Sequence, residues 1–178
     1  CIFLRGVPED YDDWSDRGNP EWRWDNVLRT FCRLERDLDF GDEDHHGDAG
    51  PITVRRYPHE ELTELHQAFL ATADELGFPE CPDQNHPSAL GSGPQPMNKL
   101  GQLRVSTASA YLAPARLRPN LEIRGGCHTD RLIIEKGRVG GVEVIGPDGS
   151  VHRIRAKLVV LCAGAIHTPG ILLRSGVG

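Results

Sequence analysis

The last twenty-one residues of the chain constrain its fold more than any other stretch. Residues 158–162 read LVVLC, an apolar run without polar alternation, which is typical of a strand buried on both faces of a parallel sheet. Residues 163–165 (AGA) follow, and so little side chain at the carboxyl end of a strand lets a ligand approach the backbone closely. Thr168 is placed to cap a helix that has Pro169 at its first position and stops near Ser175. A buried strand, a bare turn and a helix N-terminus together predict a site for an anionic dinucleotide.

The order of residues in this stretch points to one protein family, which the strand, turn and helix features alone do not. It resembles, position for position, the second signature of the glucose–methanol–choline (GMC) oxidoreductases, flavoenzymes that oxidise alcohols with FAD. The end of the family's first signature resembles Phe3, Gly6 and Asp12, and residues 104–112 are similar to the family's Arg-x-Ser-Thr-x-x-x-Tyr-Leu helix. With gaps in the loops, the resemblance covers essentially the whole chain. The second signature is matched by Gly164, Ala165, Thr168, Pro169, Ile171, Leu172, Ser175, Gly176, Val177 and Gly178.

Composition argues against several classes of protein. The net charge of −6 argues against a nucleic-acid binder, which normally presents a basic face. No apolar run approaches the length that spans a bilayer, so we expect no membrane span. Five cysteines without a close pair indicate reduced thiols in a cytoplasmic protein rather than a disulfide framework or a zinc site. Because the chain starts without Met and stops where a helix has just ended, we expect a fragment of a longer protein.

Hydrophobic periodicity predicts the remaining elements. Apolar residues recur at three- and four-residue steps over 25–38 and 60–76, which predicts two amphipathic helices. Residues 79–101 contain five prolines and are expected to form a long loop, and such a loop inside a domain is more often functional than idle. Alternating apolar residues predict strands at 52–56, 121–124, 131–135, 139–145 and 151–155, of which the last three form a β-meander.

The fold class that follows is α/β with α+β elements. In terms of the resemblance, the chain contains part of an FAD-binding Rossmann-like domain, interrupted by a three-stranded β-meander, and part of a substrate-binding domain. Residues 1–40 are expected to be a loop and helix region of the FAD domain. Residues 41–103 are expected to be a partial substrate-binding or cap region, and residues 104–178 the FAD-binding strand, meander and strand–turn–helix.

Two adjacent histidines, His45 and His46, lie in an acidic segment and raise the question of a metal site. Adjacent side chains point in different directions on most backbones, and no ligand spacing of a known site is present. We therefore expect no metal. The acidic residues around the pair are Asp42, Glu43, Asp44 and Asp48.

The resemblance implies three places where this chain contacts FAD. Cys1 and Ile2 follow an Asn of the first signature and should lie beside the flavin or its ribityl chain. Thr129 should bind the adenine edge through its backbone N–H and C=O. Ala163 and Gly164 should pack under the ribose and the pyrophosphate.

The resemblance also implies the reaction, in which hydride passes from the carbon of a small-molecule alcohol to flavin N5 and then to an unknown electron acceptor. None of the eight histidines matches the family's catalytic His, and His167 occupies a free position of the second signature. We therefore assign no catalytic residue and expect the fragment alone to be inactive.

Two other classes of function remain open. An NAD(P)-dependent Rossmann protein would need its own glycine fingerprint, and Gly91-Ser92-Gly93 has neither a strand before it nor a helix after it. A non-catalytic interaction module would explain the long loops and the acidic composition, but it would not require the residues at 162–178.

Overall fold

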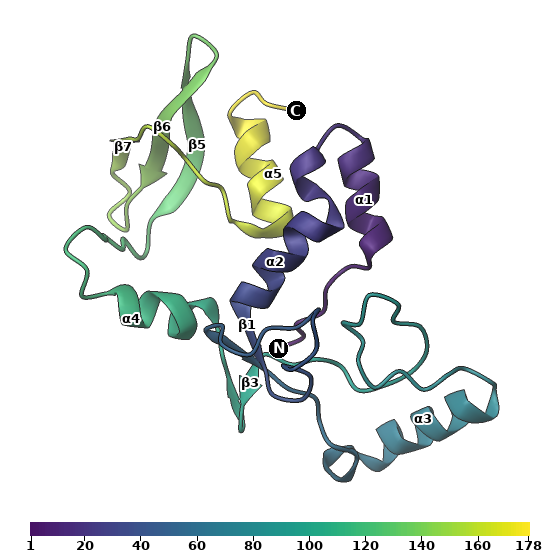
Figure 1. The fold of residues 1–178 in the computed structure, drawn as a ribbon. Helices are drawn as coiled ribbons and strands as arrows, with labels where there is room; N and C mark the ends of the chain where they lie inside the picture. Colours follow the sequence, from purple (N-terminus) through teal and green to yellow (C-terminus); the bar gives the residue numbers. More distant parts are fainter. The chain divides into compact units, whose positions relative to one another are not determined.

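A computed structural model describes residues 1–178 and divides into two compact units (Figure 1). Unit 1 comprises Cys1–Arg118 and unit 2 comprises Pro119–Gly178. Helices and small sheets are mixed, which confirms the predicted fold class. None of the helices has the length and apolar character needed to cross a membrane.

Unit 1 opens with three helical elements around an aromatic cluster. They are α1 (Pro8–Asp16), the 3₁₀-turn η1 (Pro20–Trp22) and α2 (Trp24–Leu34). Tyr11 packs its ring 5.6 Å from the rings of both Trp24 and Phe31 and 5.7 Å from that of Trp14. Aromatic pairs at these separations contribute packing energy beyond their buried area, so the cluster fixes α1 against α2.

The predicted helix over 25–38 is four residues too long at its C-terminal end. The backbone becomes extended at Glu35, and β1 (Glu35–Asp37) pairs in parallel with β2 (Ile52–Val54). Glu35 is fully buried and paired with Arg5, so the ion pair and the strand ladder together override the helical periodicity. Leu38, predicted to lie on the apolar stripe, is exposed.

The turn that leads into β2 depends on two glycines. A Cβ on Gly47 would lie 1.8 Å from the carbonyl oxygen of Cys32, and one on Gly50 would lie 2.4 Å from the backbone of Glu35. The chain therefore passes so close to α2 and β1 that no side chain fits at either position. The predicted strand at 52–56 is confirmed, with a shorter extent, and Val54 is fully buried.

The predicted helix over 60–76 is divided in two. A 3₁₀-turn, η2 (His59–Glu61), comes first, and α3 (Glu64–Glu75) follows after an extended residue at Leu62. Thr63 caps α3, because its hydroxyl accepts a hydrogen bond from the backbone N–H of His66 at 3.4 Å. The apolar stripe of this helix is largely exposed, with Leu65 at 77% and Phe69 at 66%, whereas Ala73 is buried.

Residues between α3 and the end of unit 1 form a long loop with short regular pieces. As predicted, the proline-rich segment contains no helix, and it ends in the hairpin of β3 (Lys99–Leu100) and β4 (Leu103–Arg104). A short π-helix, η3 (Ala108–Leu112), and the short α4 (Ala113–Ala115) follow. The strand predicted at 121–124 is wrong, because this segment of unit 2 pairs with no other strand.

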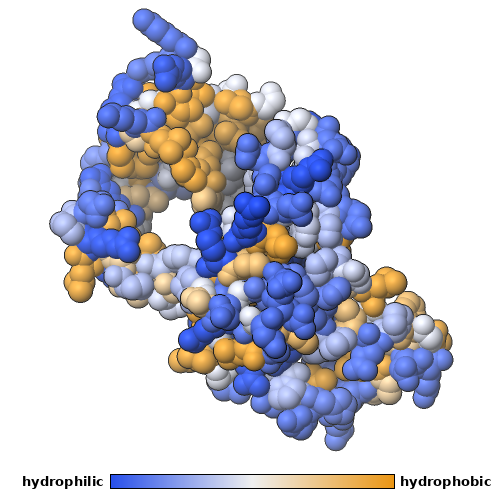
Figure 2. Space-filling model, in the orientation of Figure 1, coloured by the Kyte–Doolittle hydropathy of each residue, from blue (hydrophilic) through white to orange (hydrophobic).

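Unit 2 contains the three-stranded antiparallel meander, whose prediction is confirmed. Its strands are β5 (His128–Glu135), β6 (Arg138–Ile145) and β7 (Val151–Arg155), in spatial order β5-β6-β7. Ile133 pairs with Gly141 whereas Ile134 pairs with Val139, so Gly140 is the extra residue of a β-bulge. Figure 2 shows apolar side chains gathered over this sheet and α5.

The start of the last helix differs from the prediction. The helix α5 (Gly164–Arg174) begins five residues before Pro169, which lies inside it. The hydroxyl of Thr168 accepts a hydrogen bond from the N–H of Ala163 at 3.0 Å, so Thr168 reaches back to the helix start instead of capping a later one. The end is as expected, with Ser175 at the C-cap and Gly176 at φ +77°.

The buried strand predicted at 158–162 is wrong in this structure. The segment pairs with no other strand, and Leu158 and Val160 are 79% and 73% exposed. A strand exists only through hydrogen bonds to a neighbour, and no strand of residues 1–178 lies beside this segment.

Candidate functional site

One side of α5, from the preceding Ala163 to Arg174, and the start of β5 line a pocket of about 270 Å³ in unit 2. Thr129 and Ala163, two of the predicted cofactor-binding residues, both line it, together with His167 and Arg174. The helix is held here by Ile171, which is buried, and by the hydroxyl of Ser175, which accepts a hydrogen bond from the N–H of Leu132 at 2.8 Å. Two of the three site residues predicted in unit 2 thus meet at one pocket, and the third, Gly164, follows Ala163 in the chain but does not line the pocket.

Gly164, which follows the pocket-lining Ala163, has an open backbone. Its φ is +82°, a conformation that disfavours any residue with a Cβ, and no heavy atom lies within 4 Å of the place where a Cβ would be. Gly164 is the first residue of an eleven-residue helix, whose first N–H groups have no acceptor within the helix. Open space beside unpaired N–H groups and a positive helix end fits a phosphate-bearing group.

Arg174 lines this pocket and was not among the site residues predicted from the sequence. Its Nε donates to the carbonyl of Asp130 at 2.8 Å, and its Nη2 donates to the carbonyl of Thr129 at 3.3 Å. The same guanidinium pairs with the carboxylate of Asp130 at 3.2 Å. The C=O of Thr129, predicted to bind adenine, thus already accepts one hydrogen bond, and its second lone pair remains for a ligand. A basic residue in the last turn of a helix is the only sequence signal for Arg174.

Cys1 and Ile2, the predicted cofactor-binding residues of unit 1, lie on an extended segment. The carbonyl of Cys1 accepts a hydrogen bond from the N–H of Asn98, and the N–H of Phe3 donates to the carbonyl of Pro96, both at 2.8 Å. Both Cys1 and Ile2 are exposed. Ile2 also lines an apolar pocket of about 370 Å³ whose walls include Phe69 of α3.

A network of charged side chains, here called the buried ion cluster, lies beneath this segment. The Nδ1 of His46 lies 2.8 Å from Oε1 of Glu35, and its Nε2 lies 2.9 Å from Oδ2 of Asp83. The guanidinium of Arg56 bridges the carboxylates of Asp37 and Asp83 at 2.5 Å each. All members are buried, and they are Arg5, Glu35, Asp37, His46, Arg56 and Asp83.

The cluster balances its charges when His46 is protonated. Burial alone would lower the pKa of His46, but hydrogen bonds to Asp83 and Glu35 and the charges of Asp83 and Asp37 raise it to about 9. Burial acts to raise the pKa of Asp83, but the hydrogen bond from His46, that from the N–H of Asn85 and the charge of Arg56 hold it well below its usual range. Two guanidinium groups and one imidazolium then face three carboxylates.

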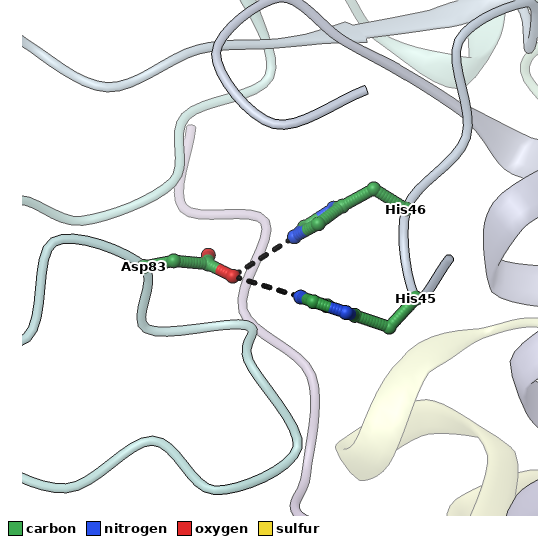
Figure 3. Close-up of side chains that lie close together, drawn as sticks. All are labelled: His45, His46 and Asp83. Carbon is green, nitrogen blue, oxygen red and sulfur yellow. Dashed lines mark hydrogen bonds and ion pairs between the residues drawn. The ribbon is translucent and has the colours of Figure 1, made fainter. Parts of the chain in front are cut away.

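The expectation that His45 and His46 point apart is wrong. Figure 3 shows both rings directed at Asp83, and the Nε2 of His45 lies 3.5 Å from its Oδ2. Potential ligand atoms of His45, His46 and Asp83 lie within 4.8 Å of one another, as do those of Glu35, Asp37 and His46. Because each of these carboxylates already pairs with a guanidinium or an imidazolium, the arrangement does not call for a cation. The absence of a metal stays a prediction.

Comparison with known proteins decides the family. The family model described as GMC oxidoreductase matches residues 1–178. The chain belongs to the GMC oxidoreductase family. The resemblance drawn from the two signatures is thereby confirmed.

Three relatives show how much of a GMC protein this chain represents. It is 42% identical over its whole length to an uncharacterised GMC-type oxidoreductase of Rhodococcus erythropolis, of which it covers 35%. It is 38% identical to a protein of Drosophila melanogaster named glucose dehydrogenase [FAD, quinone], with 99% of this chain and 29% of that protein covered. The crystal structure of pyridoxine 4-oxidase from Mesorbium loti superposes with a TM-score of 0.88 at 35% identity, covering 99% of this chain and 35% of that one. The chain therefore spans about a third of the length of its relatives.

Proposed function

We propose that the chain is part of an FAD-dependent oxidoreductase that acts on the CH–OH group of a small-molecule alcohol. The family assignment supports this proposal, as do the names of two relatives, a glucose dehydrogenase that carries FAD in its name and a pyridoxine 4-oxidase. The observation that carries it is the pocket between α5 and the start of β5, which Thr129 and the exposed Ala163 line, with the open backbone of Gly164 next to Ala163 in the chain.

In this proposal the residues of the chain hold the cofactor and take no part in bond breaking. The N–H groups at the start of α5 bind the pyrophosphate, and Ala163 and Gly164 leave room for it and for the ribose. Thr129 binds the adenine edge through its backbone, and Arg174 holds that backbone in place through its two hydrogen bonds to the strand. Cys1 and Ile2 lie beside the flavin.

FAD supplies the hydride acceptor when it is bound. The hydroxyl proton of the alcohol needs a base, and we place that base outside these 178 residues, because no histidine here matches the family's catalytic position. The chain alone is accordingly proposed to be inactive. The electron acceptor that reoxidises the flavin is not assigned.

The proposal also assigns residue ranges of the chain to domains and gives the protein a location in the cell. Residues 1–40 and 104–178 belong to the FAD domain, and residues 41–103 belong to the substrate-binding or cap region. The proposed location is the cytoplasm, which rests on the five cysteines without a close pair in the sequence.

The experiment that tests the proposal uses the whole protein that contains this chain and compares two glycines at the two ends of α5, Gly164 at its start and Gly176 just after its C-cap. Gly164 and Gly176 lie at opposite ends of α5 with φ of +82° and +77°, and neither has a heavy atom within 4 Å of its missing Cβ. Valine at either position therefore introduces a similar backbone strain. We expect Gly164→Val to lose bound FAD, and Gly176→Val to keep it at a similar loss of thermal stability.

Flavin content and melting temperature are measured for both variants and for the parent. Equal flavin content in the two variants would contradict the assignment of the pyrophosphate to the start of α5. His167→Ala, which removes a side chain from the wall of the same pocket at a free signature position, is expected to keep most of its FAD.

A further inference from the structure

The backbone of residues 1–5 is fixed although three of its side chains, those of Cys1, Ile2 and Leu4, are exposed. Four hydrogen bonds hold it: two with the backbone of Pro96 and Asn98, and two with the side chain of Asn85. Ile2 is nevertheless 62% exposed. A fixed backbone that presents an apolar side chain outward is suited to hold that side chain against a partner surface.

We propose that Asn85 is a positioning residue, whose side-chain amide fixes residues 3–5 and so sets where Cys1 and Ile2 meet the cofactor. This inference rests on the proposed function, since it takes FAD as the group that Cys1 and Ile2 contact.

The amide of Asn85 acts on this segment as a neighbouring strand would. Its Oδ1 accepts a hydrogen bond from the N–H of Arg5 at 2.9 Å, and its Nδ2 donates to the carbonyl of Phe3 at 3.0 Å. Both partners thus belong to one short stretch of backbone, 80 and 82 residues away in sequence. Asn85 is only 3% exposed, so water cannot replace either bond when the amide is removed.

Asn85 is in turn held by the buried ion cluster. Its backbone N–H donates to Oδ1 of Asp83 at 3.0 Å, and the same carboxylate pairs with Arg56 and His46. The position of residues 3–5 is therefore set through Asp83 by charges on two other segments of unit 1. This gives the proline-rich loop a function, because Asn85, Pro96 and Asn98 all lie in it.

Asn85→Asp is the sharpest perturbation of this contact. It keeps the shape and the acceptor for Arg5, but it replaces the Nδ2 donor by a carboxylate oxygen that faces the carbonyl of Phe3. Asn85→Ser, which is smaller and uncharged, is a second variant in case the added charge prevents folding.

Asp37→Asn serves as the matched control. Asp37 is a buried member of the same cluster that pairs with Arg56, and its other oxygen accepts from the N–H groups of Asp39 and Phe40. Asp37 has no hydrogen bond or ion pair with residues 1–5, so the control variant damages the cluster at a member that is not in direct contact with that segment.

The test uses the whole flavoprotein and three readouts: the FAD dissociation constant, the visible circular dichroism of the bound flavin, and hydrogen exchange of residues 1–5 in the apoprotein. We expect both Asn85 variants to accelerate exchange in residues 1–5 and to alter the flavin dichroism. We expect them to weaken FAD binding about tenfold, the scale of one or two lost buried hydrogen bonds. Asp37→Asn is expected to leave the dichroism unchanged at an equal or larger loss of melting temperature.

Two results would overturn the inference. Asn85 variants that loosen residues 1–5 but keep the parent's FAD affinity and dichroism would leave the proposed function intact and remove the positioning role. The positioning role would also be removed if Asp37→Asn changed the FAD affinity and the flavin dichroism as much as the Asn85 variants do. A parent protein without FAD would overturn the proposed function itself, and the inference with it.

Discussion

The protonation of His46 gives a pH dependence of stability whose sign and size follow from the structure. His46 is buried between Glu35 and Asp83, and its pKa rises from 6.5 to about 9 on folding. A group whose pKa is higher in the folded state than in the unfolded state contributes its full stabilisation at pH values below its unfolded-state pKa. That contribution is lost as the pH rises through the folded pKa. The difference between the two pKa values corresponds to about 3 kcal/mol in the free energy of unfolding. Stability should therefore fall between about pH 6.5 and about pH 9.

The assay is urea unfolding across this pH range, followed by tryptophan fluorescence. All three tryptophans of the chain, Trp14, Trp22 and Trp24, lie in the α1–η1–α2 region, so the signal reports on unit 1. His46→Gln should be less stable than the parent at low pH and should lose the pH dependence due to His46. His66→Gln, which alters an exposed histidine on α3, is the control and should follow the parent curve. A parent and a His46→Gln variant with parallel pH profiles would refute the protonated buried ion cluster.

Two further predictions follow from close packing and from the unpaired segment. Gly47→Ala should destabilise unit 1 by about 3 kcal/mol or more, because its Cβ would lie 1.8 Å from the carbonyl of Cys32. Gly125→Ala is the control, because a Cβ there meets open space and the residue has no positive φ. Urea titration should show little change in stability for this variant. Equal losses of stability in the two variants would contradict the packing described for Gly47. The isolated 178-residue chain should bind FAD weakly or not at all and should aggregate through residues 158–162, whose apolar side chains are exposed. Light scattering and flavin titration check this, and a monomeric chain with stoichiometric FAD would disprove it.

The elements that the sequence predicted correctly are those whose stability is local. The meander of β5, β6 and β7 was readable from alternating apolar residues in three consecutive short segments. Its first turn, at Lys136-Gly137, where both residues have positive φ (50° and 75°), joins neighbouring strands and needs no distant partner. Of the residues that line the unit 2 pocket, Ala163 was found because it directly precedes the signature at 164–178, and Thr129 was found from the resemblance to the family.

The elements that were predicted wrongly depend on partners distant in sequence. The run at 158–162 has the composition of a strand buried on both faces, yet it pairs with no strand among these residues. The periodicity over 25–38 was interrupted at Glu35 by an ion pair with Arg5, 30 residues away. The buried ion cluster could not be anticipated, because Asp83 lies 37 residues from His46 in a loop without periodicity.

The most direct test of the account is the FAD content of the whole protein that contains this chain, followed by anaerobic addition of small alcohols. The account predicts a yellow protein with one FAD per chain, released on denaturation, whose visible flavin band is bleached by an alcohol of the right shape. The matching aldehyde should leave that band unchanged. A folded but colourless protein, from which no FAD can be extracted and which binds none on reconstitution, would contradict it.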